Sequence, residues 1–208
     1  MRDVYLGPEY SNERIEQALK RADLSYKISA DIEREAASLL AEGMVVGWFQ
    51  GRMEFGPRAL GNRSILGNPL IPGTSDRINE MVKFREKWRP FCPSILREHA
   101  GEIMGRDMDA PFMTLSFSVT NEWKRRIPEV VHVDGTMRPQ TVSHNDNPRF
   151  YKLIKLFFMK TGVPVLINTS LNRRGEPMVA SPEDAIRMYL GSGLDHLAIG
   201  DFLVSRKE

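Results

Sequence analysis

The stretch MVVGWFQGRMEFGPRALGNRSIL, residues 44–66, joins a short apolar run to a segment rich in glycine and arginine. The run at residues 44–50 is typical of a buried strand, because strands covered on both faces show continuous apolar sequence. Glycines and a proline disfavour regular structure over residues 51–66, so we expect a loop beyond the end of that strand. The sequence therefore predicts a central strand that delivers the chain into an arginine-rich loop.

This loop carries more positive charge than its own acidic residue can pair. Arg52, Arg58 and Arg63 share it with a single acid, Glu54. The planar guanidinium group suits carboxylate and phosphate oxygens, and glycine lets backbone N–H groups approach a ligand. One interpretation is an anion-binding loop, and the other is a surface loop whose arginines are solvated. Composition alone does not separate the two.

Helical and strand patterns alternate on both sides of this stretch. We expect helices after Ser11, over 30–42, 73–84 and 147–162 and after Ser181, and strands over 44–50, 111–119, 129–135, 163–168 and 196–207. The Asp134-Gly135 pair is typical of a hairpin turn within residues 132–142. The expected fold class is α/β, a twisted sheet of mixed direction flanked by helices, in one domain spanning residues 1–208.

Helix starts are marked by residues suited to capping. Ser181 is followed by Pro182 and by Asp184 at the third position after it, which is typical of a strong helix start. Either Thr74 or Ser75 is the expected N-cap of the 73–84 helix.

The bulk composition is that of an ordinary soluble globular protein, with 41% apolar and 27% charged residues among 208. A net charge of +2 argues against a nucleic-acid partner for the whole chain, so anion recognition must come from local clusters. The only cysteine, Cys92, excludes a disulfide framework and a cysteine-based zinc site, and its apolar neighbours predict burial. No membrane-length apolar run and no signal-peptide core are present, so we expect a cytoplasmic protein without a membrane partner.

Basic residues fall at every second position of residues 82–91: Lys83, Arg85, Lys87 and Arg89. In an extended chain all four would point to one face. Pro90 disfavours helix at the residue before it, so at least the end of this segment is extended. A charge run of this kind is also typical of a solvated face, and both interpretations stay open.

Two further segments place polar side chains near expected strand ends. In residues 132–142, Arg138 follows the expected turn, and His132 is either an acid–base group or a hydrogen-bonding residue. The run at 163–168 leads into Asn168, Thr169 and Ser170. Short polar side chains at the carboxyl end of a strand are common ligand positions in α/β sheets, and they are also common in caps and turns.

Familiar catalytic signatures are absent, among them the P-loop, the dinucleotide-binding glycine pattern, the G-x-S-x-G elbow and H-E-x-x-H. An ordinary P-loop or Rossmann enzyme is therefore disfavoured. The four histidines show no paired metal-ligand spacing, so no metal site is expected: His99, His132, His144 and His196.

Five segments occur in the order seen in the C-terminal part of the O-carbamoyltransferases, which modify nodulation factors and aminoglycoside or cephem antibiotics. They are GRMEFGPRALGNRSIL (51–66), INEMVKFREKWRPFCPSIL (78–96), HVDGTMRPQTV (132–142), PVLINTSLNRRGEPMV (164–179) and SPEDAI (181–186). The resemblance covers the chain from Leu6 to Ser205, and its long motifs are specific. The chain also resembles, more faintly, the YrdC-type domain that makes threonylcarbamoyl-adenylate for tRNA modification.

The resemblance implies a YrdC-like fold that makes carbamoyl-adenylate from carbamoyl phosphate and ATP, both small-molecule substrates. Mg²⁺ is expected to accompany the ATP, bound mostly by its phosphates. In that family a separate N-terminal, Kae1-like domain, which carries a metal, transfers the carbamoyl group to an acceptor hydroxyl. This sequence contains no such domain, so the resemblance implies that the transferase domain is a missing partner.

The resemblance also assigns site residues. It implies catalytic roles for Arg58, Lys83, Arg89 and Arg138. It implies binding of ATP or carbamoyl phosphate by Arg52, Arg63, His132, Asn168, Thr169 and Ser170. Both substrates are polyanions, so fixed cations in an enclosed pocket would stabilise the charge that develops as the adenylate forms.

Two other functions are compatible with the same residues. A non-catalytic YrdC-like module would bind a nucleotide or RNA, but aromatic residues that could stack on bases are not interleaved with the basic ones here. A threonylcarbamoyl-adenylate synthase would use bicarbonate and threonine. The long motif at 51–66 favours the carbamoyltransferase alternative.

Overall fold

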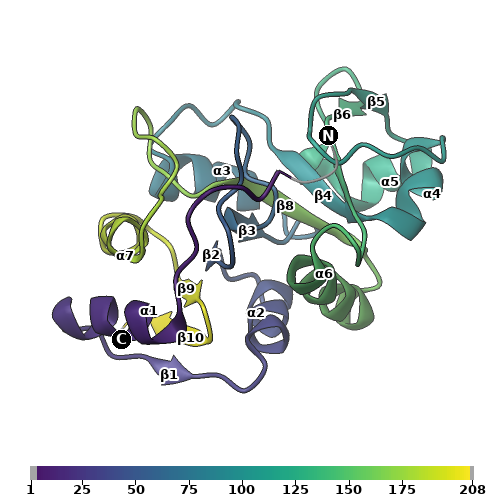
Figure 1. Cartoon of the computed structure of the whole chain (residues 1–208). Coiled ribbons are helices and arrows are strands. Elements are labelled where there is room, and N and C mark those ends of the chain that lie inside the picture. The colour runs from purple at the N-terminus through teal and green to yellow at the C-terminus, as the bar shows by residue number, and fades with distance from the viewer. Residues whose placement is uncertain (1–3, 207–208) are drawn as a thin grey trace.

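Strand β2 (Val46–Phe49) lies inside an eight-stranded sheet of the computed structural model, which describes residues 4–206 (Figure 1). The strand order is β1-β10-β9-β2-β3-β8-β4-β7. β2 pairs in parallel with β9 (His196–Ile199) and antiparallel with β3 (Arg63–Gly67). One further pair, β4 with β7, is parallel, and the others are antiparallel. The expected α/β fold with a sheet of mixed direction is therefore confirmed.

The remaining elements surround this core. The other strands of the sheet are β1 (Lys27–Ile28), β4 (Cys92–Leu96), β7 (Gln140–Val142), β8 (Val165–Ser170) and β10 (Phe202–Ser205), while β5 (Phe117–Ser118) pairs separately with β6 (Thr136–Met137). The α-helices are α1 (Asn12–Arg21), α2 (Ile32–Ala41), α3 (Thr74–Arg77), α4 (Ala100–Met104), α5 (Asn121–Arg126), α6 (Pro148–Thr161) and α7 (Pro182–Leu190). A π-helical turn, η1 (Ile78–Val82), continues α3, and two 3₁₀ turns are η2 (Arg97–His99) and η3 (Pro128–Val130).

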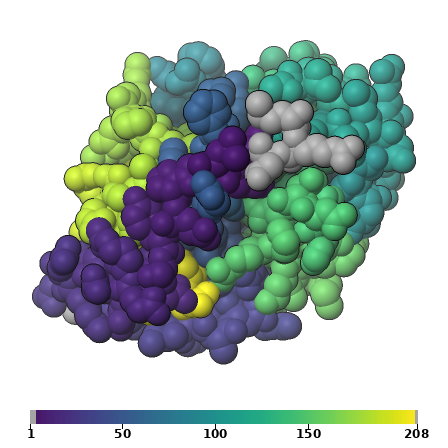
Figure 2. Space-filling model, viewed as in Figure 1, coloured from purple at the N-terminus to yellow at the C-terminus, as the bar shows by residue number. Residues whose placement is uncertain are grey.

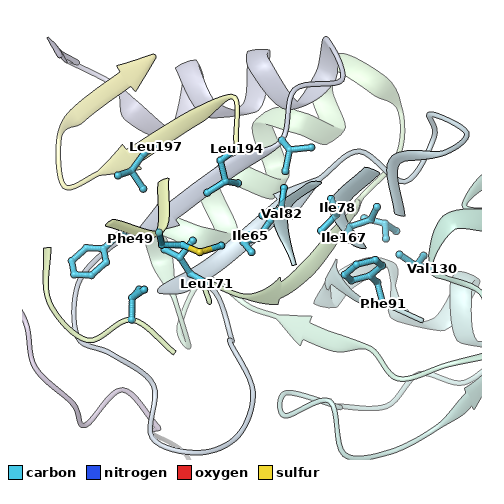
Figure 3. Close-up of a cluster of buried hydrophobic side chains, with 14 of the residues drawn as sticks. Phe49, Ile65, Ile78, Val82, Phe91, Val130, Ile167, Leu171, Leu194 and Leu197 are labelled. Atoms are coloured by element: carbon cyan, nitrogen blue, oxygen red, sulfur yellow. The ribbon is translucent and has the colours of Figure 1, made fainter. Parts of the chain in front are cut away.

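Both faces of the sheet are covered, and successive strand residues alternate between them. In β2, Trp48 joins a cluster with α2 and α6, whereas Phe49 joins the larger cluster on the opposite face. In β8, Leu166 and Ile167 divide in the same way. Figure 3 shows part of the larger cluster, in which side chains from β2, β3 and β8 pack together. The continuous apolar run at 44–50 is thus explained by burial on two sides.

Helix boundaries follow the capping chemistry in most places. The Ser11 side chain accepts a hydrogen bond from the Arg14 N–H, and Ser181 and Asp184 form a capping box. The prediction that Thr74 or Ser75 is the N-cap of this helix is wrong. The N-cap residue is Gly73, which has no side chain to accept a capping hydrogen bond. The helix that follows changes to a π-helical turn after one turn.

Two expected strands are largely irregular. Only Phe117–Ser118 of the 111–119 run is a strand, and the 129–135 run begins with the 3₁₀ turn η3. Glu129 of that turn accepts hydrogen bonds from the Gly73 and Ser75 N–H groups, which ties the segment to α3 instead of to a sheet.

The expected hairpin at 132–142 forms its turn but not its ladder. The His132 N–H donates to the Thr136 carbonyl and the Gly135 N–H to the His132 carbonyl, at 2.7 and 2.8 Å. Beyond the turn, β6 pairs with β5 and β7 pairs with β4. Pro139 separates β6 from β7 and lacks an N–H donor, so the two strands join different sheets.

The expected loop at 51–66 ends earlier than predicted, because β3 begins at Arg63. Gly61, at φ +103°, lies against α6, and a Cβ there would be 2.2 Å from the Phe150 ring. The loop is also paired with the chain's first described residues, since the Gly7 N–H donates to the Met53 carbonyl and the Phe55 N–H to the Val4 carbonyl. Figure 2 shows this N-terminal segment as a purple band across the molecule.

Candidate anion-binding site

A pocket of about 110 Å³ lies at the carboxyl end of β8. Its polar lining comes from four separate segments and consists of Arg58, Arg85, Arg138, Asn168, Thr169 and Ser170. Apolar residues complete the wall, among them Phe91, Cys92 and Met113. No aspartate or glutamate lines it. The pocket is therefore small, cationic and free of internal neutralising groups.

The three arginines have no carboxylate partner within the part of the chain that the structure describes. The side chains of Arg58 and Arg138 make no hydrogen bond or ion pair there. The side chain of Arg85 donates only through Nε, at 2.6 Å, to the neutral side-chain oxygen of Asn79, among the described residues. Three guanidinium groups around one small pocket repel each other, so an anion between them lowers the electrostatic energy.

Asn168 forms the floor of the pocket and is 1% exposed. Its Nδ2 donates to Ser94 Oγ at 2.9 Å, to Gln140 Oε1 at 3.2 Å and to the Ala59 carbonyl at 3.3 Å. Gln140 in turn donates to the Leu60 carbonyl at 2.8 Å. This buried network joins β4, β7 and β8 to the loop that carries the first arginine, and so fixes the distance between the pocket's walls.

Glu54, the one acid of the arginine-rich loop, binds backbone and not a guanidinium group. Its Oε1 accepts hydrogen bonds from the N–H groups of Leu60, Asn62 and Arg63 at 2.7, 2.7 and 3.2 Å. The carboxylate is buried and closes the turn after Arg58. The loop is thus held in shape by its acid, while Arg58 stays unpaired.

Lys83 contacts the end of β8 and is 4% exposed. Its Nζ donates to the Ser170 carbonyl at 2.8 Å, to Ser170 Oγ at 3.3 Å and to the Asn172 carbonyl at 2.7 Å, and it also contacts Asn172 Oδ1. Lys83 therefore does not line the pocket. It holds the end of β8, where Ser170 forms part of the wall.

Anion binding in the pocket should be coupled to proton uptake by Lys83. Burial, and then the charges of Arg85 and Arg89, lower the pKa of Lys83 to about 7. A bound anion offsets that repulsion and raises the pKa, so the complex holds more protons and affinity should fall as pH rises above 7. Calorimetry with sulfate, in buffers of different ionisation heat, measures this uptake. Lys83→Met should abolish it, and an unchanged uptake in that variant would assign it to another group.

The other residues assigned from sequence lie outside the pocket lining. Arg89 is exposed, although its charge acts on Lys83 and Arg85. His132 is partly buried, with Nδ1 at 3.2 Å from Thr136 Oγ1, and burial and then Arg138 lower its pKa.

Arg52 and Arg63 serve the loop's structure. Arg52 is exposed and donates to the Leu6 carbonyl at 2.9 Å. Arg63 is 0% exposed, and its guanidinium lies 3.6 Å from the centre of the Phe49 ring. Its terminal nitrogens donate to four backbone carbonyls, those of Pro8, Gln50, Gly51 and Asn62. Burial lowers the pKa of Arg63 to about 10. Neither side chain lines the pocket.

Arg85 is the pocket arginine that the sequence analysis did not assign. The alternation of basic residues over 82–91 included it, but that pattern treated four residues alike. Arg85 lines the pocket and Lys87 does not. Both follow the π-helical turn η1, and no residue type marks such a turn in a sequence, so the sequence could not show which of the two reaches the pocket.

A second, larger cleft of about 510 Å³ adjoins the pocket. It shares Arg58 and Arg138 with the pocket, but its other walls are mostly apolar and include Phe55, Leu60 and Phe112. A ligand with an anionic part at the shared arginines would have space for a larger apolar part in this cleft.

Within residues 4–206, no group of three or more His, Cys, Asp or Glu side chains is placed to bind a metal ion. No helix in that range combines the length and apolar character needed to span a bilayer.

The fold and the pocket together define an α/β protein with an arginine-lined pocket at the end of a central strand. Residues 37–206 match the family described as "Carbamoyltransferase C-terminus". The chain therefore belongs to the carbamoyltransferase family and corresponds to its C-terminal part, as the motifs predicted.

Curated relatives support the same assignment. The chain is 44% identical to nodulation protein NolO of Bradyrhizobium diazoefficiens, over 99% of this chain and 38% of that protein. It is 40% identical to a 3'-hydroxymethylcephem-O-carbamoyltransferase of Amycolatopsis lactamdurans, over 84% of this chain and 33% of that protein. The chain thus spans only 38% and 33% of the length of these two relatives.

Solved structures show the fold. P. abyssi Sua5, in a complex with L-threonine, superposes with a TM-score of 0.56 at 19% identity, covering 81% of this chain and 46% of that one. Full-length HypF, in a phosphate- and nucleotide-bound form, gives a TM-score of 0.50 at 15% identity, covering 89% of this chain and 22% of that one. The expected YrdC-like fold is confirmed by these neighbours.

Proposed function

We propose that the pocket binds carbamoyl phosphate and the phosphates of ATP, and that the protein forms carbamoyl-adenylate. The observation that carries this proposal is that Arg58, Arg85 and Arg138 line one pocket without any acidic residue among its walls. Both substrates are polyanions, and carbamate is unstable in water. A cationic pocket attracts both substrates, and binding in it limits their contact with solvent.

The reaction creates charge where the arginines are. Water hydrolyses carbamoyl phosphate to carbamate and phosphate, and a carbamate oxygen then attacks the α-phosphorus of ATP. The bond from that phosphorus to the bridging oxygen breaks, and pyrophosphate leaves with the electron pair. Guanidinium groups stabilise the developing negative charge, and we assign this role to Arg58 and Arg138 because they line both the pocket and the larger cleft.

The two cavities would bind different parts of the substrates. The pocket of about 110 Å³ accommodates a small anion, and the apolar cleft of about 510 Å³ accommodates the nucleoside. The pocket offers no carboxylate to a cation, so Mg²⁺ would be held by the nucleotide's phosphates and not by these residues.

The proposal extends to the whole enzyme. This chain would be the activating part of a cytoplasmic O-carbamoyltransferase that acts on a sugar hydroxyl of a nodulation factor or antibiotic-like acceptor. A single domain over residues 1–208 would activate the carbamoyl group, and a Kae1-like domain outside it would transfer that group.

The direct test is mass detection of carbamoyl-AMP after the protein is mixed with ATP, Mg²⁺ and carbamoyl phosphate. We expect carbamoyl-AMP, phosphate and pyrophosphate in equal amounts, and no carbamoylated product with chito-oligosaccharide or amino-sugar acceptors. A parallel reaction with bicarbonate and threonine tests the synthase alternative, and threonylcarbamoyl-AMP there would replace the proposal. Nucleotide binding without either adenylate would indicate a binding module.

A further inference from the structure

A third cavity, of about 770 Å³, lies at the edge of the sheet that β7 forms. It shares Val4 and Phe112 with the apolar cleft, which in turn shares Arg58 and Arg138 with the anion pocket. We call this cavity the polar cleft, and its lining comes from residues 4–5, residue 97, and residues within 109–112 and 140–147. Its volume is in the range of about 300–1,000 Å³ that is typical of small-molecule sites.

The polar cleft differs from the anion pocket in charge. Its charged side chains are Arg97, Asp109 and Asp146, one cation against two anions. Arg97 is ion-paired with Asp109, and with Asp107 at 2.6 Å. Carboxylates repel phosphate and sulfate, and the one arginine is already neutralised, so the polar cleft does not continue the anion site.

Uncharged hydroxyl and amide groups supply the rest of its polar side chains, which are Tyr5, Gln140, Thr141, Ser143, Asn145 and Asn147. Amide and hydroxyl groups can both donate and accept hydrogen bonds, and so can the hydroxyls of a polyhydroxylated ligand. Asn145 is exposed, and its side chain makes no hydrogen bond within residues 4–206. Its amide is therefore free to bond to a ligand.

Two aromatic side chains, Tyr5 and Phe112, form an apolar part of the wall. Both are half-buried and pack against the buried cluster that contains Leu60 and Met113. The Tyr5 hydroxyl also donates to the Leu60 carbonyl at 2.9 Å. A wall that combines aromatic rings with a few directional polar groups suits a ligand with an apolar ring face and polar edges.

The turn at residues 143–147 is held in place by bonds within the protein. Ser143 Oγ donates to Asp146 Oδ2 at 2.5 Å. Asn147 is 7% exposed, and its side chain accepts from the Phe150 N–H at 3.0 Å and donates to Asn62 Oδ1 at 2.8 Å. These bonds join the rim of the polar cleft to α6 and to the arginine-rich loop, so a ligand there would have to order little of the chain.

We infer that the polar cleft binds a neutral sugar, through hydrogen bonds from its hydroxyls to the amide and hydroxyl side chains and with one ring face against Phe112. This site goes beyond the proposed function, which assigns no sugar contact to this chain. Sugar binding itself requires no carbamoyl chemistry. Its use rests on the proposed function: the sugar would be part of the acceptor, bound along the same groove in which its carbamoyl group is activated.

The first experiment titrates the isotope-labelled chain with chitotriose and with maltotriose, two neutral trisaccharides, and follows the amide signals by NMR. With at least one of them we expect saturable shifts below about 20 mM sugar, at residues 141–147 and at the side-chain amide of Asn145. The shifts should persist in saturating sulfate. No saturable shift with either sugar, or competition by sulfate, would overturn the inference.

The second experiment compares two asparagine substitutions. Asn145→Ala should weaken binding of the trisaccharide roughly three- to tenfold, as loss of one or two hydrogen bonds predicts, and leave sulfate binding within about twofold. Asn121→Ala is the matched control, because Asn121 is exposed at the start of α5 and lines none of the three cavities. Equal effects of the two substitutions on sugar binding would refute the site.

These measurements separate failure of this inference from failure of the proposed function. A chain that binds the trisaccharide at residues 141–147 but forms no carbamoyl-AMP would refute the proposed function and retain the sugar site. A chain that forms carbamoyl-AMP and binds neither trisaccharide would refute only the sugar site.

Discussion

Replacement of Arg138 by alanine is expected to lower the rate of carbamoyl-adenylate formation by roughly 10²–10³-fold, the usual effect of removing one donor to a developing oxyanion. The guanidinium lies between the anion pocket and the apolar cleft and has no hydrogen-bond or ion-pair partner among the described residues. Its removal therefore takes away interaction with substrate and leaves no protein group unpaired, so stability should change little.

Lysine at position 138 distinguishes charge from geometry. Arg138→Lys keeps the charge but loses the planar fork, so we expect a rate between those of the wild type and Arg138→Ala. Single-turnover measurements with carbamoyl phosphate and ATP give the rates, and urea unfolding gives the stability of each variant. Near-normal rates in both variants would make Arg138 peripheral and would require a different assignment of the pocket.

Replacement of Arg63 by methionine is expected to destabilise the fold by about 3 kcal/mol or more, because four backbone carbonyls lose their donor at once and two of these contacts are buried. Replacing both members of a buried ion pair by apolar residues often leaves the stability of a protein unchanged, because no partner is left unpaired. Here the guanidinium bonds to backbone of residues 8 and 50–62, which stays in place after the substitution. Urea unfolding should show a lower midpoint with an unchanged slope.

Arg52→Met is the matched control for Arg63. Arg52 belongs to the same loop but is exposed, and its side chain donates to the Leu6 carbonyl. We expect its substitution to change stability by no more than about 0.5 kcal/mol. If instead Arg63→Met weakens sulfate binding without affecting stability, Arg63 contacts the ligand as its motif implied, and its structural role is refuted.

Elements with strong local signals were predictable from the sequence. The capping box at Ser181, the cap at Ser11 and the apolar run of β2 each express a local preference that the fold retains. The 111–119 run has strand composition, but only Phe117–Ser118 pairs. Strand formation there depends on which segments become neighbours, and local sequence does not contain that information.

The candidate site also contains some residues that the sequence identified and others whose position depends on the fold. The motifs pointed to Arg58, Arg138 and the end of β8, and the structure brings these into one pocket. Arg63 belongs to the same motif as Arg58, yet it is buried under backbone carbonyls. Only four residues lie between them, and the difference arises from the turn closed by Glu54. A motif identifies the segment, whereas the path of the backbone decides which of its side chains reaches the ligand.

The π-helical turn η1 makes the length of this segment as important as its composition. In an α-helix each residue advances about 100° around the axis, so losing one residue from 78–82 would rotate everything after it by that angle. Lys83 and Arg85 would then face away from the end of β8, even with every functional residue retained. Alignments of relatives should therefore contain gaps in the exposed stretch at 105–109 but none within η1, and a one-residue gap there would identify a chain that has lost the activity.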